Sequence, residues 1–136
     1  MGVEERRLLA MTDEEVIRIS LEHFAGLFPK TCGRCGRCYA TFRDYVLATD
    51  TVGAAVSYDA EAADWETQQP LGAMALANCP CGSTLAVTTE GIPLPKIHSM
   101  LEWMRVETDR RGVNPSELLE YVRVEVRRRA LAELAH

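Results

Sequence analysis

The stretch Thr31-Cys-Gly-Arg-Cys-Gly-Arg-Cys38 contains three of the five cysteines of this chain, and the other two lie in Asn78-Cys-Pro-Cys-Gly82. Forty residues lie between Cys38 and Cys79. The chain begins with a polar, charged segment that lacks a long apolar region, so a secretory signal is not expected. In the reducing compartment that this implies, clustered cysteines more often bind a metal or carry out redox chemistry than form disulfides. The two stretches therefore predict one site that ties two loops together.

Each cysteine stretch has the form of a turn that can present thiolates to a metal. Cys32 and Cys35 are separated by two residues and followed by glycine, whereas the second pair is one residue shorter. Two such turns can supply the four thiolates that tetrahedral Zn²⁺ prefers in structural sites. The expected zinc ligands are Cys32, Cys35, Cys79 and Cys81. Cys38 is the alternative to Cys32, because Cys35 and Cys38 repeat the Cys-Gly-Arg-Cys spacing.

This pattern of paired cysteines resembles the zinc-ribbon class of proteins over residues 31–90. The resemblance implies a β-hairpin region whose turns hold the metal. The short second pair departs from the usual pattern of that class.

Two other chemistries remain open for the cysteines. Three cysteines at intervals of three residues, followed by a distant Cys-Pro, partly resemble a bacterial ferredoxin run and allow an iron–sulfur cluster. In that run, however, the fourth cysteine follows closely rather than after forty residues. A thiol redox centre is the second alternative, although no βαβ pattern surrounds the cysteines. We expect His23, His98 and His136 to be helix or terminal residues rather than ligands.

The remaining sequence predicts an α+β fold in one domain, residues 1–136. Thr12-Asp-Glu-Glu15 is a capping box, and the apolar residues after it recur at helical spacing. We therefore expect an N-terminal helix over 13–28. Residues 39–49 favour a short helix, with a strand as the alternative, and 51–58 favour an extended segment.

Two further strands are expected on either side of the second cysteine pair, over 71–77 and 84–89. They would form a hairpin whose turn carries both thiols, while the acidic stretch 59–70 between the extended segments is expected to be a surface loop. Two C-terminal helices are expected within 94–135, separated by Gly112 and restarted at Asn114-Pro115.

Side chains on the C-terminal helices suggest two roles. Met100, Trp103 and Met104 lie on one helix face, either in the core or as an exposed contact surface. The arginines near the end of the chain are more typical of a solvated helix face, because Glu120 can pair with Arg123 and Glu125 with Arg129. The arginines beside the first cysteines balance the negative charge of thiolates.

Net charge, apolar segment length and the absence of catalytic motifs limit the classes of function that this chain could have. The net charge of −5 disfavours general affinity for nucleic acid. No segment approaches the roughly 20 apolar residues of a membrane span, so we expect a cytoplasmic protein. A site of four thiolates has no open position for a reacting water, and no hydrolytic triad or phosphate-binding loop is present, so a catalytic role is disfavoured without being excluded.

These observations predict a zinc-stabilised, non-enzymatic interaction or regulatory protein. A protein partner, or a second copy of the chain, would bind through the C-terminal helices. The alternatives are a zinc-ribbon protein that binds nucleic acid and an iron–sulfur or thiol redox protein.

Overall fold

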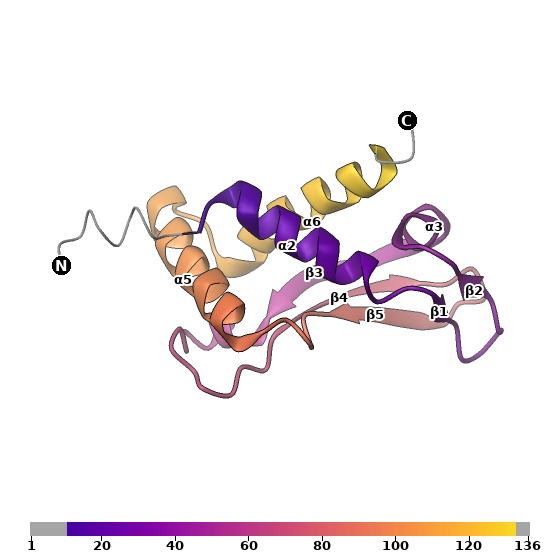
Figure 1. The fold of residues 1–136 in the computed structure, drawn as a ribbon, viewed down its shortest axis with the longest axis horizontal. Coiled ribbons are helices and arrows are strands. Elements are labelled where there is room, and N and C mark those ends of the chain that lie inside the picture. Colours follow the sequence, from indigo (N-terminus) through magenta and orange to yellow (C-terminus); the bar gives the residue numbers. More distant parts are fainter. Residues whose placement is uncertain (1–10, 133–136) are drawn as a thin grey trace.

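The computed structural model describes residues 11–132 and has the α+β fold that the sequence predicts. Figure 1 shows a three-stranded sheet beneath helices, with a small two-stranded sheet at one end. The helices are α2 (Asp13–Ala25), α3 (Phe42–Ala48), α4 (Tyr58–Glu61), α5 (Leu94–Arg111) and α6 (Pro115–Ala132). The strands are β1 (Lys30–Thr31), β2 (Cys38–Tyr39), β3 (Asp50–Ser57), β4 (Ala73–Asn78) and β5 (Thr84–Thr88).

The three-stranded sheet is antiparallel, in the order β3-β4-β5. Strands β4 and β5 form the predicted hairpin, with Ala75 opposite Val87 and Asn78 opposite Thr84. Strand β3 is the predicted extended segment, and its pairing with β4 is irregular between Val52 and Val56. Because side chains alternate along a strand, one face of the sheet is directed towards the helices. Helix α6 packs on β3, and α2 packs on α6.

The N-terminal helix begins where the capping box predicts. The Thr12 hydroxyl accepts a hydrogen bond from the Glu15 amide at 3.1 Å. The helix ends at Ala25, before the predicted end at residue 28, because Gly26 takes the C-cap position and its amide bonds to the Glu22 carbonyl. Thr12 and Glu15 thus set the start of α2, and glycine sets its end.

The middle of the chain contains more secondary structure than the sequence predicts. Within residues 39–49 the helix is α3, whereas Cys38 and Tyr39 belong to strand β2. Residues 59–70 were expected to be a loop, but α4 occupies their start and its N-cap is Ser57. The buried Asp59 carboxylate accepts from the amides of Leu71 and Gly72, each at 2.9 Å, and this fastens the end of the loop to its beginning.

The two C-terminal helices are separated at Gly112, which has a left-handed φ of 65°. Asn114 and Glu117 then cap α6 reciprocally, each side chain accepting from the other's amide. The predicted end of this helix beyond residue 132, and His136, lie outside the described residues. None of the helices in the described part of the chain has the length and apolarity that a membrane span needs.

The stripe on α5 belongs to the core. Trp103 and Met104 are buried, and Met100 packs against them while partly exposed. The interpretation of these three residues as an exposed contact surface is therefore wrong. The sequence pattern could not separate the two, because an apolar helix face looks the same whether a neighbouring helix or a partner covers it.

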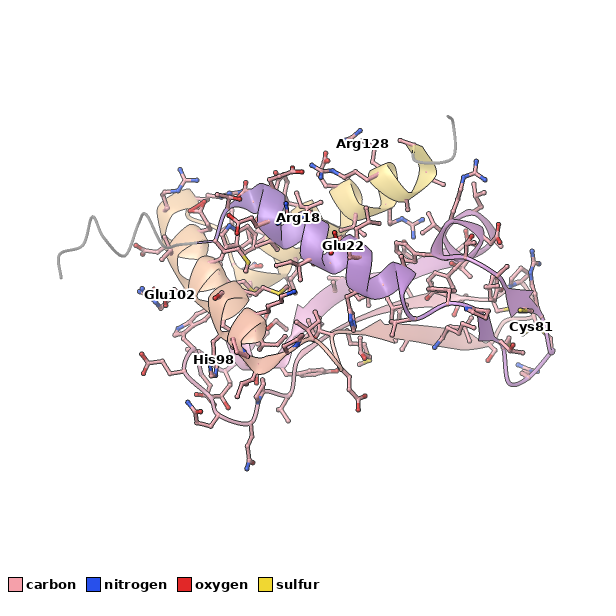
Figure 2. The ribbon with its side chains drawn as sticks, in the orientation of Figure 1. Arg18, Glu22, Cys81, His98, Glu102 and Arg128 are labelled. Atoms are coloured by element: carbon pink, nitrogen blue, oxygen red, sulfur yellow. The ribbon has the colours of Figure 1, made fainter. Side chains whose placement is uncertain are left out.

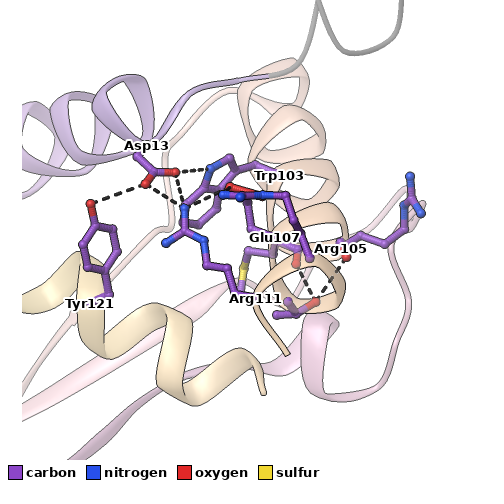
Figure 3. Close-up of polar contacts among 9 residues, drawn as sticks. Asp13, Trp103, Arg105, Glu107, Arg111 and Tyr121 are labelled. Carbon is purple, nitrogen blue, oxygen red and sulfur yellow. Dashed lines mark hydrogen bonds and ion pairs between the residues drawn. The ribbon is translucent and has the colours of Figure 1, made fainter. Parts of the chain in front are cut away.

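A polar network joins helices α2, α5 and α6 (Figure 3). The Asp13 carboxylate accepts from the Arg111 guanidinium at 2.7 Å and from the Trp103 indole at 3.0 Å. The Tyr121 hydroxyl donates to the same carboxylate at 3.4 Å. Arg111 also pairs with the buried Glu107 at 2.9 Å. This network connects α2, α5 and α6 through charged groups that are largely shielded from water.

We predict that Glu107→Gln lowers the free energy of unfolding at pH 7 by about 1 to 2 kcal/mol. Hydrogen bonds from Arg110, and then Arg111, lower the pKa of Glu107 to about 2. The ordinary value is 4.5, so this stabilisation is complete above about pH 4.5 and is lost as the pH falls towards 2. The variant should lose less stability than the wild type across that interval, as measured by urea unfolding at each pH.

Glu14→Gln is the matched control, because Glu14 pairs with Arg129 at the exposed surface. Exposed pairs contribute little to stability, so this variant should resemble the wild type. Equal acid sensitivity of wild type and Glu107→Gln would contradict the role assigned to Glu107.

Candidate metal centre

Four cysteine sulfurs meet at the end of the molecule where the β1–β2 loop faces the β4–β5 turn. Figure 2 shows Cys81 there, at the end opposite His98. The Sγ atoms of Cys32, Cys35, Cys79 and Cys81 all lie within 4.8 Å of one another. The Cys32–Cys81 and Cys35–Cys79 sulfur distances are each 3.7 Å. Each loop thus contributes two sulfurs, and each short distance joins one loop to the other.

Cys38 lies outside this group. It belongs to strand β2, pairs with Thr31 of β1 and is exposed. The sequence left Cys32 and Cys38 as alternatives, because both have the same spacing from Cys35. The structure places Cys32 with the other three sulfurs, since Cys32 begins the loop whereas Cys38 has already entered the returning strand.

The local backbone explains why the loops present their sulfurs. In the first loop the Cys32 amide donates to the Arg37 carbonyl, and the Gly36 amide donates to the Cys32 carbonyl, both at 2.9 Å. In the second, the Gly82 amide closes a turn onto the Cys79 carbonyl at 2.8 Å. Gly36 and Gly82 have φ of 77° and 93°, which other residues rarely adopt. The glycine after each cysteine pair is therefore a requirement of the turn.

Tyr39 is a part of the site that the sequence analysis missed. Its hydroxyl donates to Cys79 Sγ at 2.9 Å, and its side chain is buried. The Arg37 guanidinium lies over the Tyr39 ring, 5.4 Å from its centre. One feature of the sequence could have indicated Tyr39. Side chains alternate along a strand, so in a strand that returns from the cysteine loop Tyr39 points to the face opposite that of Cys38.

The thiols differ in their environments. Amide hydrogen bonds from Cys35 and Arg34 lower the pKa of Cys32 to about 6, and the Tyr39 hydroxyl is the main cause that lowers the pKa of Cys79. The pKa of Cys81 is raised to about 11, because burial and the neighbouring thiols outweigh the hydrogen bond from the Ser83 amide. Burial, with Cys79 beside it, raises the pKa of Tyr39 to about 12, so this hydroxyl keeps its proton and remains a donor.

The geometry makes this group able to hold a metal ion. Cys32 and Cys79 are buried, Cys81 is half-buried and only Cys35 is exposed. A tetrahedral metal with metal–sulfur bonds of about 2.3 Å would separate its sulfurs by about 3.8 Å. The Cys32–Cys81 and Cys35–Cys79 sulfur distances of 3.7 Å match that value. Four thiolates would complete the coordination and leave no position for a substrate.

His23 and His98 lie outside the group of four sulfurs. His23 Nε2 bonds to the Thr88 carbonyl at 2.9 Å, and His98 Nε2 bonds to the Thr67 carbonyl at 2.8 Å. His23 thus connects α2 to strand β5, and His98 connects α5 to the loop that contains Thr67. Arg34 and Arg37 are exposed beside the cysteines, where their charge can balance that of thiolates.

Comparisons of the chain with protein-family models, with curated proteins and with solved structures found no match, so the interpretation of this centre depends on its own geometry.

Proposed function

We propose that this chain is a zinc-stabilised protein that acts by binding rather than by catalysis. The observation that carries the proposal is the convergence of four cysteine sulfurs from two loops into one group. Zinc favours such a tetrahedron of thiolates, and structural zinc sites are closed in this way. The two facing turns also agree with the resemblance to zinc ribbons, which stays a prediction.

The spacing of the sulfurs favours a single ion over an iron–sulfur cluster. In a cluster, several irons and inorganic sulfides lie between the cysteines, which must then stand further apart than the ligands of one ion. Here all four sulfurs lie within 4.8 Å of one another. Cys38 lies outside this group of sulfurs, so it supplies no further ligand. The same geometry would suit a single iron, so the preference for zinc follows from the common use of four-cysteine sites.

The binding role is proposed for the C-terminal helices. Tyr121, Val124 and Leu131 are exposed apolar side chains spaced along one side of α6. A protein partner, or a second copy of the chain, could cover them. A nucleic-acid partner is less well supported, because Arg123, Arg128 and Arg129 of this helix pair with carboxylates. Arginines engaged in that way are less available to phosphates.

We predict that the purified protein is colourless and contains one zinc per chain, and that Cys81→Ser removes it. Loss of one thiolate opens the site, so the melting temperature should fall by about 10 °C. Elemental analysis and thermal unfolding measure the two effects. Cys38→Ser is the matched control and should keep both zinc and stability, because Cys38 lies outside the sulfur group. Equal zinc loss in both variants would contradict the proposed ligand set.

We further predict that Tyr39→Phe weakens zinc binding by about tenfold while leaving the fold intact. The hydroxyl donates to the Cys79 sulfur, and groups that support metal ligands in this way typically affect affinity by 10- to 100-fold. Competition with a chromophoric chelator measures the change. Tyr58→Phe is the control, because Tyr58 is exposed and follows the end of β3 that is distant from the cysteines. Unchanged affinity in Tyr39→Phe would show that the hydrogen bond does not support the metal.

A further inference from the structure

A cavity of about 120 Å³ lies between the three-stranded sheet and helices α2, α5 and α6. Its wall is almost wholly apolar. The sheet leaves this space because the strands present small side chains to it, among them Ala55 of β3 and Ala75 and Ala77 of β4. Larger residues at these positions would reach the helices and close the gap. The cavity is separate from the cysteines, none of which lines it.

The lining of the cavity extends along most of strand β3. Its wall includes Thr51 near one end of β3 and Ser57 at the other, a span of about 20 Å at the rise of roughly 3.3 Å per strand residue. A compact apolar cavity of about 150 Å³ is large enough for a benzene ring. A smaller volume drawn out along a strand suits an extended alkyl chain better than a ring.

One polar group in the wall lacks a partner. Tyr45 of α3 lines the cavity, and its side chain is 2% exposed. Its hydroxyl has no hydrogen-bond partner among the described residues. Burial raises the pKa of Tyr45, so the hydroxyl keeps its proton and is available as a donor. A buried hydroxyl without a partner is costly, and a ligand oxygen would remove that cost.

A positive charge lies near the Tyr45 hydroxyl. Arg127 also lines the wall, and its charge acts on the Tyr45 hydroxyl. Within residues 11–132, Arg127 forms no ion pair with a carboxylate, whereas Arg123, the other arginine in the wall, pairs with Glu120 and donates to the Gly53 carbonyl. The cavity thus combines an apolar body with an available donor and an available cation.

The end of the cavity near Ser57 offers no such pair of a donor and a cation. Asp59 lines the wall there, but both oxygens of its carboxylate are occupied by the amides of Leu71 and Gly72. The negative charge of Asp59 would also repel an anion. A ligand with one charged end would therefore place that end beside Tyr45 and Arg127.

We propose that this cavity binds a linear, medium-chain carboxylic acid. The alkyl chain lies along the alanine-lined face of the sheet, and the carboxylate accepts a hydrogen bond from the Tyr45 hydroxyl and pairs with Arg127. Burial of the chain provides most of the affinity, because apolar surface leaves water. The two polar contacts select a carboxylate over an alcohol of equal length. None of the four cysteines of the proposed metal centre contributes to this site.

The test is isothermal titration calorimetry of the full, metal-loaded chain with decanoate below its micelle concentration. We expect one decanoate per chain, with at least about tenfold weaker binding of both decanol and benzoate. Absence of decanoate binding would overturn the proposal and identify the cavity as a packing gap. Equal or tighter binding of decanol would overturn the carboxylate assignment, and tighter binding of benzoate would overturn the linear shape.

Variants locate the binding. Arg127→Gln should weaken decanoate about tenfold and leave decanol unchanged, because only the charged contact is lost. Tyr45→Phe should weaken decanoate about threefold or more. Arg128→Gln is the matched control, since Arg128 is exposed and does not line the cavity. Decanoate binding that is indifferent to Arg127→Gln would overturn the proposal.

A second variant blocks the cavity itself. Ala75→Leu places a larger side chain against the helices, and it should abolish binding of both decanoate and decanol. Circular dichroism and thermal unfolding establish that this variant is folded. If Ala75→Leu destabilises the fold, Ala75→Val provides a smaller block, with intermediate binding expected. Undiminished binding in a folded blocking variant would place the ligand elsewhere and overturn the assignment.

Discussion

The convergence of four sulfurs is the constraint on which one end of the molecule depends. Strands β1 and β2 consist of two residues each, and such a short pair is not stable by itself. The loop between them faces the β4–β5 turn through sulfur distances of 3.7 Å. A metal held there would join segments some forty residues apart. The buried core is continuous, from α2, α5 and α6 on the sheet to Cys32, Tyr39 and Cys79 at this end.

Aromatic residues connect the cysteine group to the cavity. Strand β2 leads into α3 within a few residues, so the position of α3 follows from that of the cysteine loop. The Tyr39 and Tyr45 rings meet edge to face with their centres 5.7 Å apart. Tyr39 donates to a cysteine sulfur, while Tyr45 lines the cavity. One pair of neighbouring rings therefore lies between the proposed metal and the proposed acid site.

Local signals in the sequence predicted most of the elements and the cysteine group, but not α4, β1 and β2. The capping box placed the start of α2, and the spacing of the cysteines singled out the four that meet, with Cys38 as an open alternative. The sequence did not show that Cys38 and Tyr39 form a strand. Their place in β2 keeps Cys38 away from the other sulfurs and directs the Tyr39 hydroxyl to Cys79. The burial of Trp103 and the cavity beside Ala75 depend on how helices pack over the sheet. These features are tertiary, and no local pattern encodes them.

X-ray absorption spectroscopy of the protein as purified tests the central claim most directly, because it reports the metal, its ligands and their distances together. The account predicts absorption at the zinc edge, with four sulfur neighbours at about 2.3 Å and no nitrogen or oxygen ligand. Iron with a second iron nearby, fewer than four sulfur neighbours, or the absence of a bound metal would contradict it.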